Sequence, residues 1–431
     1  MKRPHAPSSS PAPEPTGTPA RRAALKLLDA VLRRGLPLEA ALGAVGGLPK
    51  AEDRGLARAI ASEVLRRLPD LDALIDSATA KPLPDDAKAR FALRIALVQV
   101  LLLGTPPHAA IATALPLVDG GPRRLVHGVF GTLMRGEAVL PDLPTLPDPV
   151  AMRWTAAWGD DAAEAARTGL IGRPPLDLTL ADPAATATWA EQMGASSLAP
   201  GHLRLSAEAE VMALPGYAEG AWWVQDLSAS LPARLLGAPE GDGVVLDLCA
   251  APGGKTLQLA AAGWRVAAVE MAGHRLARLS ENLERTGLAA ETIEADVMRW
   301  RPSAPVDAVL LDAPCSATGI YRRHPDVLHR VRAPAIADLA VTQGAMLARA
   351  AEWVKPGGQL VYAVCSLEPQ EGEAVAGAFA DRRGFTIDPV QTEELPQGLV
   401  PTVEGFVRVA PGALVEAGGC DGFFVARFRK S

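Results

Sequence analysis

The spacing of hydrophobic positions changes along the chain and divides it into parts. Between residues 20 and 140, apolar residues recur three or four positions apart, which is the period of one helix face. The sets are Leu25, Leu28 and Leu32, then Ile60, Val64, Leu65 and Leu68, and then Phe91, Ile95, Val98 and Leu102. A last helix is predicted over 127–134, and the stretch shows no strand-like alternation. Residues 20–140 are therefore predicted to form an all-α domain.

Short apolar runs in the C-terminal half predict the strands of an open, doubly wound α/β sheet of Rossmann-like type. The predicted strands are 244–248, 265–269, 292–295, 306–311 and 360–364, with a helix over 256–262. Residues 1–19, rich in Pro, Ser, Ala and Thr, predict a disordered leader. Residues 141–225 are assigned to a linker, marked by the Pro- and Leu-rich stretch 140–149, and a small middle subdomain. Residues 226–431 are assigned to the α/β domain.

Charge is distributed unevenly along the chain. The 431 residues carry a net charge of −6, which alone argues against nucleic-acid binding. Residues 20–140, however, hold 17 Lys and Arg against 12 Asp and Glu, an excess of +5, while residues 141–431 come to −12. The basic residues include four arginine pairs: Arg21–Arg22, Arg33–Arg34, Arg66–Arg67 and Arg123–Arg124. These pairs are compatible with docking on RNA phosphates, and equally with ordinary solvated helix faces.

Composition also predicts a cytoplasmic protein without a membrane segment. The longest apolar run, Ile95–Leu103, contains Gln99 and is far shorter than the ~20 residues of a membrane span. The N-terminus lacks the apolar segment of a secretory signal. Only four cysteines occur, which suits a reducing compartment. No Cys/His spacing predicts a metal site, and we expect a monomer.

A glycine-rich loop follows the predicted strand 244–248. It reads Cys249-Ala250-Ala251-Pro252-Gly253-Gly254-Lys255. Its paired glycines let the backbone approach a ligand and offer amide groups at the start of a helix. A phosphate-binding P-loop would need a glycine at the position of Cys249, and the dinucleotide pattern G-x-G-x-x-G is absent. The loop therefore predicts neither a kinase nor a dehydrogenase.

Acidic residues stand at the ends of the next two predicted strands. Glu270 suits the two hydroxyls of a ribose, as in other doubly wound nucleotide sites, and Asp296 is placed to meet an adenine amino group. A glycine loop followed by these two acids predicts a nucleoside ligand without phosphates. S-adenosylmethionine fits, because the carboxylate of its amino-acid tail can use the amides of the loop.

Two of the four cysteines stand where predicted strands end. Cys315 lies in the segment Leu311-Asp312-Ala313-Pro314-Cys315-Ser316, and Cys365 lies in Tyr362-Ala363-Val364-Cys365-Ser366. Open α/β sheets place their chemistry at such strand ends, although buried structural thiols are the simpler alternative. Cys249 and Cys420 are interpreted as packing or loop cysteines.

From about residue 225 onward the chain resembles the RNA cytosine-C5 methyltransferase family. Over its whole length it resembles the bacterial 16S ribosomal RNA enzymes of the Sun/Fmu type, which have a NusB-like N-terminal domain. The matching words are Val224–Asp226, Leu246–Thr256, Leu311–Gly319, Arg322–Asp326, Lys355–Gly358, Tyr362–Ser366 and Asp421–Phe424. Val364 stands where the family usually has threonine, and Glu270 where it usually has aspartate. Leu176–Leu180 replaces a segment that usually carries an arginine and an asparagine, a departure that concerns RNA contacts of the middle region.

The resemblance implies a NusB-like RNA-binding domain and an S-adenosylmethionine-dependent enzyme that methylates C5 of one cytidine in the small-subunit ribosomal RNA. It implies that Cys365 adds to C6, which makes C5 reactive, and that Cys315 assists release. Asp312 is expected to hydrogen-bond the base and, with residues 249–255, Glu270 and Asp296, to bind the cofactor. Lys255 is expected to pair with a carboxylate. The target base must be unpaired or flipped for the thiolate to reach it.

Other functions stay open at this point. DNA cytosine methylation would use the cysteine of a Pro-Cys pair, here Cys315, as the nucleophile. Methylation of another RNA such as tRNA, or a non-catalytic role as an RNA-binding adaptor, would use the same domains. The adaptor leaves unexplained why both cysteines and the whole cofactor loop are present.

Overall fold

The computed structural model describes residues 15–44, 50–380 and 384–431. The chain divides into two compact units, Met1–Pro147 (the helical unit) and Asp148–Ser431 (the α/β unit), and the division falls within the Pro- and Leu-rich stretch 140–149. Residues 1–14 of the predicted leader lie outside the described residues, and the first helix already begins at Thr18. No described helix is long and apolar enough to cross a membrane.

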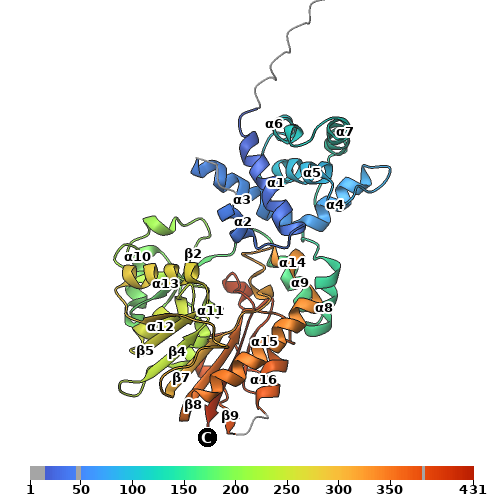
Figure 1. The fold of residues 1–431 in the computed structure, drawn as a ribbon. Coiled ribbons are helices and arrows are strands. Elements are labelled where there is room, and N and C mark those ends of the chain that lie inside the picture. Colours follow the sequence, from blue (N-terminus) through green and yellow to red (C-terminus); the bar gives the residue numbers. More distant parts are fainter. Residues whose placement is uncertain (1–14, 45–49, 381–383) are drawn as a thin grey trace, which may run out of the picture. The chain divides into compact units, whose positions relative to one another are not determined.

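The helical unit contains only helices in its described residues, as its periodicity predicts (Figure 1). They are α1 (Thr18–Leu32), α2 (Leu38–Ala44), α3 (Ala51–Arg66), α4 (Leu68–Ser77), α5 (Lys88–Leu101), α6 (Pro107–Ala114) and α7 (Gly121–Arg135). α1 packs on α3, and α5 contacts α1, α3, α4, α6 and α7. Leu28, Ile60, Val64 and Ile95 are fully buried there. Most residues that carry the helical period therefore form the core or pack against it. Leu102, which follows α5, is the exception and is exposed.

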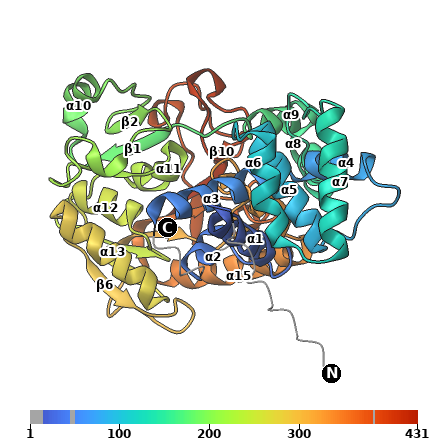
Figure 2. The same cartoon turned by 90° about the horizontal axis from the view of Figure 1, so that it is seen from above.

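The α/β unit begins with two helices and a small sheet. The helices are α8 (Asp148–Trp158) and α9 (Asp160–Thr168). Three antiparallel strands follow in the spatial order β2 (His202–Leu205), β1 (Leu176–Leu180) and β3 (Trp222–Val224), with α10 (Thr186–Met193) packed on β2 (Figure 2). Leu178, Leu203 and Trp222 form its apolar core. This small sheet lies within the residues that the sequence assigns to the middle subdomain.

An eight-stranded sheet forms the centre of the α/β unit. Its order is β10–β11–β8–β7–β4–β5–β6, with β9 paired to β11. The strands are β4 (Val244–Leu248), β5 (Arg265–Glu270), β6 (Glu291–Glu294), β7 (Val306–Asp312), β8 (Val354–Val364), β9 (Phe385–Ile387), β10 (Val407–Val409) and β11 (Phe423–Lys430). β4 to β8 are parallel, and β9 to β11 pair antiparallel. The predicted Rossmann-like α/β fold is confirmed.

The predicted strands and the observed ones agree closely except at β8. The prediction began this strand at Leu360, because Lys355–Gly358 has the composition of a turn, but β8 begins at Val354. Gly358 passes so close to β7 that a Cβ atom there would lie 2.6 Å from the carbonyl oxygen of Asp307. The pairing register also shifts at this point. A glycine-containing irregularity, rather than a turn, carries these residues into the sheet.

Helices cover both faces of the sheet (Figure 1). α11 (Leu227–Leu236), α12 (Gly254–Ala261) and α13 (Gly273–Thr286) cover one face, and α15 (Ala333–Glu352) and α16 (Glu373–Ala380) cover the other; the short α14 (Val327–Arg330) precedes α15. Leu310 of β7 packs toward the first group and Leu311 toward the second. Because successive strand side chains point to opposite faces, a strand covered on both sides needs a nearly continuous apolar run.

Candidate active site

Five parallel strands end at one edge of the sheet, and each brings a predicted site residue there. In sheet order these residues are Cys365 after β8, Asp312 and Cys315 at the end of β7, Cys249 after β4, Glu270 at the end of β5 and Asp296 after β6. The chain leaves β4 toward β5 and β6, then returns to form β7 on the other side of β4. Open α/β sheets bind their ligands at such a reversal of strand order.

A cavity of about 480 Å³ opens at this edge. Predicted site residues in its wall are Cys249, Ala251, Glu270, Asp296, Asp312, Cys315 and Cys365. The other predicted site residues, all of them described, do not line it: Ala250, Pro252, Gly253, Gly254 and Lys255. Apolar side chains that the sequence analysis missed, among them Met271, Val297, Met298 and Met346, also form the wall. One cavity therefore joins Cys249, Ala251, Glu270, Asp296 and Asp312, which are part of the predicted cofactor set, to the two thiols.

The glycine loop is held in shape by α13. Gly253 has a left-handed backbone (φ 107°), and a Cβ atom on it would lie 3.0 Å from the side chain of Leu279. Arg275 and Asn282 donate hydrogen bonds to carbonyl oxygens of the loop at 2.6 and 3.0 Å. The left-handed backbone and the close approach to Leu279 explain why the loop needs glycine at this position.

The two acids beyond the loop fit a nucleoside. Glu270 is buried, and its Oε1 accepts the backbone N–H of Ala272 at 3.0 Å. Its Oε2 lies 3.3 Å from the guanidinium of Arg275 but accepts no hydrogen bond from the described residues, so it can take a ligand hydroxyl. Asp296 is partly exposed, and its Oδ1 accepts the N–H of Met298 at 2.9 Å. The residues present therefore fit the S-adenosyl group.

Asp312 forms an ion pair with Lys255. It is therefore the carboxylate that the lysine was expected to pair with. The Lys255 ammonium donates to Asp312 Oδ2 at 2.8 Å and lies 5.3 Å from the centre of the Phe423 ring. Burial alone would lower the pKa of Lys255, but Asp312 and Asp247 outweigh it and raise that pKa. Asp247 itself accepts the Thr256 hydroxyl at 2.6 Å, and burial raises its pKa to about 7. Lys255 therefore stays charged at this edge.

The two thiols of interest are in contact. Cys315 Sγ and Cys365 Sγ are 3.4 Å apart, a hydrogen-bonding distance for sulfur. The hydrogen bond with Cys365 and burial raise the pKa of Cys315 well above its usual value, so this thiol keeps its proton. Burial raises the pKa of Cys249 to about 12, and burial also raises the pKa of Cys420. Cys249 and Cys420 are therefore poor nucleophiles.

A buried carboxylate that the sequence analysis missed joins the two cysteine loops. Glu371 is fully buried and accepts the N–H of Ser316 at 2.9 Å, the hydroxyls of Ser316 and Ser366, and the side-chain amide of Gln343 at 3.0 Å. Gln343 also donates to the carbonyl of Pro314 at 3.0 Å. The one sequence signal that could have pointed to this arrangement is the repeated Cys-Ser dipeptide.

Three of the words that carry the family resemblance meet at Asp226. Its carboxylate accepts the N–H of Ser228 at 2.9 Å, the guanidinium of Arg323 at 2.9 Å and the N–H of Asp421 at 3.2 Å. Arg323 also donates to the carboxylate of Asp421 at 3.1 Å, and burial and the charge of Asp226 raise the pKa of Asp421 to about 7. The words occur together because their side chains form one polar cluster.

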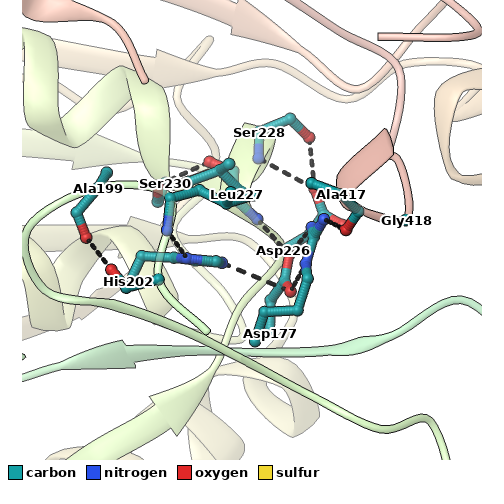
Figure 3. A network of polar contacts seen from close by, with 12 residues as sticks. Asp177, Ala199, His202, Asp226, Leu227, Ser228, Ser230, Ala417 and Gly418 are labelled. Carbon is teal, nitrogen blue, oxygen red and sulfur yellow. Dashed lines mark hydrogen bonds and ion pairs between the residues drawn. The ribbon is translucent and has the colours of Figure 1, made fainter. Parts of the chain in front are cut away.

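The segment Leu176–Leu180, which departs from the family pattern, forms β1, and its aspartate is buried. Asp177 accepts two hydrogen bonds of 2.7 Å from Arg204 and one of 3.1 Å from the N–H of Leu227, and His202 Nε2 lies 3.4 Å away (Figure 3). Burial alone would raise the pKa of Asp177, but Arg204 and His202 lower it well below its usual range. Only 1% of Asp177 is exposed. It therefore cross-links the small sheet to α11 and is too buried to contact RNA.

The arginine pairs of the helical unit differ in exposure. Arg21 and Arg66 are buried, and Arg21 donates to Gln99 at 2.7 Å. Arg33–Arg34 and Arg123–Arg124 are exposed. Buried guanidinium groups support the helical core, so only part of the basic excess can meet phosphates.

Both units match known proteins. The family model described as 16S rRNA methyltransferase RsmB/F matches residues 234–429, and that of the NusB family matches residues 18–127. The ribosomal RNA small subunit methyltransferase B of Sodalis glossinidius is 36% identical over 385 residues, which cover 83% of this chain and 88% of the relative. The ribosomal RNA small subunit methyltransferase B of Klebsiella pneumoniae is 34% identical over 435 residues, which cover 95% of this chain and 98% of the relative. The crystal structure of PH0851, at 22% identity, covers 97% of this chain and all of its own with a TM-score of 0.72, which shows a shared fold.

Proposed function

The chain belongs to the 16S rRNA methyltransferase RsmB/F family, whose cofactor is S-adenosylmethionine, and we propose that it methylates C5 of one cytidine in the small-subunit ribosomal RNA through a covalent bond between Cys365 and C6. The main support is the pair of thiols, 3.4 Å apart, in a cavity that Glu270 and Asp296 also line. One thiol can attack the base while the other assists its release.

Attack by Cys365 solves the problem that C5 of cytosine is a weak nucleophile. The thiolate forms a bond to C6, and the electrons of the C5–C6 double bond make C5 reactive. S-adenosylmethionine, when bound, supplies the electrophilic methyl group. Lys255 supports the thiolate, because its charge and that of Cys365 attract each other. An unpaired RNA loop presents the base at little cost.

Asp312 stabilises the ring once it has been attacked. Lys255 holds Oδ2 of Asp312, which leaves Oδ1 to accept a hydrogen bond from the exocyclic amine or from a protonated N3. Because the ion pair fixes the carboxylate, it does not have to reorient when negative charge builds up on the base. Asp312 thus connects the charged lysine to the reacting ring.

Cys315 is assigned to release. After transfer, C5 carries both a proton and a methyl group. A solvent water takes the proton, the electron pair of the C5–H bond re-forms the C5–C6 double bond, and the bond from C6 to Cys365 breaks with its electron pair on the sulfur. The S–H of Cys315, which its raised pKa keeps protonated, can donate to the departing sulfur. The contact between the two free thiols is the hydrogen bond that this step needs.

The remaining assignments concern binding. Glu270 would bind the ribose hydroxyls of the cofactor and Asp296 its adenine. Its carboxylate would be bound by N–H groups of the glycine loop other than those of Ala250 and Gly253, which already donate to the carbonyls of Val269 and Ala250. In the helical unit, the exposed Arg33–Arg34 and Arg123–Arg124 dock RNA phosphates. We propose that the protein acts as a monomer in the cytoplasm, where ribosomal RNA is modified.

Small-subunit ribosomal RNA that contains 5-fluorocytidine tests the covalent step, because fluorine at C5 cannot leave as a proton does. The wild-type protein should be trapped on it, seen as a slow band on a denaturing gel. Cys365→Ala should form no adduct and lose methyl transfer by more than about 10⁴-fold. Cys315→Ala should still attack, then stall on ordinary RNA as a stable adduct.

The reverse pattern, an adduct with Cys365→Ala and none with Cys315→Ala, would support the DNA-type order of the two cysteines instead. Trapping on tRNA but not on ribosomal RNA would change the substrate. No adduct and no methylation with any RNA would leave only a binding role.

A further inference from the structure

We propose that Glu371 is a positioning residue that ties the Cys315 loop to the Cys365 loop and keeps the two sulfurs in contact. Its meaning for catalysis rests on the proposed function, although the separation of the thiols can be measured without any reaction on RNA. Glu371 acts through the serine that follows each cysteine.

The hydrogen bonds of Glu371 come from both cysteine loops and from α15. Oε1 accepts the N–H of Ser316 and the amide of Gln343, and Oε2 accepts the hydroxyls of Ser316 and Ser366, the latter at 2.5 Å. A carboxylate offers about four acceptor positions, so this set uses its full capacity. Because Ser316 and Ser366 are the direct neighbours of Cys315 and Cys365, Glu371 cannot shift without moving both thiols.

The loop that carries Cys315 is also pinned on either side of the cysteine. On one side, Gln343 donates to the carbonyl of Pro314 at 3.0 Å. On the other side, the N–H of Gly319 donates to the carbonyl of Cys365 at 3.0 Å, and a Cβ atom on Gly319 would collide with the backbone of Gly422. Glu371 binds between these two points. The loops are also joined by the contact between the hydroxyls of Ser316 and Ser366 at 3.1 Å and by the bond from the N–H of Leu367 to the hydroxyl of Thr318 at 3.0 Å. Removal of Glu371 therefore loosens the stretch that bears the sulfur, because it takes away the carboxylate that fixes both serines and the N–H of Ser316.

A second buried acid three residues away serves a different purpose and offers a control. Glu368 is 1% exposed, but its carboxylate binds Arg153 at 3.2 Å and the indole of Trp154 at 3.1 Å, both on α8. The side-chain contacts of Glu368 thus lead away from the cysteine loops, whereas those of Glu371 lead into them. The two residues are equally buried, so substitutions at both should cost stability, but only Glu371 should affect the thiols.

The test uses the full-length protein and measures how fast diamide joins Cys315 to Cys365, with the linked peptides identified by mass. Glu371→Ala should slow this oxidation about tenfold or more, because the sulfurs meet less often. Glu371→Gln should restore most of the rate, since serine hydroxyls can accept as well as donate hydrogen bonds. Glu368→Ala should lower thermal stability and leave the rate as in the wild type.

The two serines should divide the effect on catalysis. Ser366→Ala should slow adduct formation without accumulation of adduct, because it loosens the Cys365 loop. Ser316→Ala should let covalent RNA accumulate, because it loosens the loop that assists release. Glu371→Ala should slow both steps and reduce kcat by roughly 100-fold, with little change in KM for the cofactor. General destabilisation would not separate attack from release in this way.

The outcomes distinguish this inference from the proposed function. If Glu371→Ala binds S-adenosylmethionine normally and is oxidised as fast as the wild type, Glu371 does not position the thiols. If oxidation slows as expected but the wild type forms no adduct with RNA, the positioning role stands and the proposed function is wrong. If Glu371→Ala does not fold, Ser316→Ala and Ser366→Ala decide: unchanged oxidation and unchanged kinetics in both would refute the tether.

Discussion

Two buried carboxylates of the α/β unit have hydrogen-bond partners of different charge. Asp177, in the small sheet, is bound by the Arg204 guanidinium, with His202 nearby. Glu371, between the cysteine loops, takes its hydrogen bonds from serines, a backbone N–H and an amide, all uncharged. Both are almost completely shielded from solvent. The difference lies in the charge of the partners, not in the depth of burial.

The difference follows from what lies next to each carboxylate. Around Asp177 there is no reacting group, so a cation can neutralise it and join the small sheet to α11 without consequence for chemistry. Beside Glu371 lie two thiols, of which Cys365 is the proposed nucleophile, and the charge of Lys255 interacts with that of Cys365. Neutral donors hold the loops but do not offset the charge of the Glu371 carboxylate, which contributes to the raised pKa of Cys315 beside the hydrogen bond with Cys365 and burial. Ion pairing thus serves the fold in one region, and neutral hydrogen bonding serves the site in the other.

The largest effect on stability is expected at Asp177. Asp177→Ala leaves the guanidinium of Arg204 buried without its carboxylate, a change that costs about 3–5 kcal/mol in comparable cases. Thermal unfolding of the full-length protein should shift down by several degrees, while the rate of diamide oxidation in the folded protein stays as in the wild type. A changed oxidation rate would mean that the two regions are not independent.

A double variant sharpens this prediction. Asp177→Leu with Arg204→Met removes both charges, and replacing a buried ion pair by apolar groups is often neutral. Most of the lost thermal stability should therefore return. If the double variant is as unstable as Asp177→Ala, the cost comes from lost shape or from the contacts with Leu227 and Ala417 rather than from an unpaired charge.

The elements that could be predicted from sequence are those whose signal is local. β4 has the predicted bounds, because an apolar run there meets a glycine loop directly. Cys249, Glu270, Asp312, Cys315 and Cys365 could be placed at strand ends for the same reason, and parallel strands bring such ends to one edge.

Features that depend on distant partners could not be predicted. Glu371 meets Ser316 from 55 residues away, and nothing near it in sequence marks it as buried. The sequence shows that the segment of Asp177 departs from the family pattern, but not that its aspartate pairs with Arg204, which lies opposite it on β2. Likewise, Arg21 and Arg66 look like surface arginines, since a basic pair in a helix gives no sign of which face the core will cover.

A third buried carboxylate, Asp247, extends the comparison to pH. It has one hydrogen bond, from Thr256, and its Oδ1 has no partner among the described residues; burial raises its pKa from 3.8 to about 7. Between these values the folded protein keeps a proton that the unfolded chain releases, so this stabilisation is present at low pH and is lost as the pH rises through 7. Asp247→Asn, which stays neutral, should therefore gain stability relative to the wild type between pH 5 and pH 8.

The gain is on the order of 2–4 kcal/mol at pH 8, which a pH series of thermal unfolding curves can resolve. Asp177→Asn should lose stability at neutral pH, the opposite of the change expected for Asp247→Asn. The reason is that the pKa of Asp177 is lowered and its charged form stabilises the fold. If the thermal stabilities of wild type and Asp247→Asn change with pH in parallel, Asp247 is ionised in the folded protein. The lack of a second hydrogen-bond donor would then not keep its carboxyl group protonated.

The smallest effect on stability is expected at Asp296, where a substitution should instead change ligand binding. Its side chain is 37% exposed and lies 3.6 Å from Arg299 at the surface, so Asp296→Ala should leave thermal unfolding nearly unchanged. Loss of a hydrogen bond from adenine to the carboxylate should weaken S-adenosylmethionine binding roughly tenfold in calorimetry. Glu240→Ala, an exposed acid that does not line the cavity, is the matched control and should bind as the wild type does. Equal affinities in the two variants would remove Asp296 from the cofactor site, and tight ATP binding with no response to S-adenosylmethionine would contradict the whole assignment of the cavity.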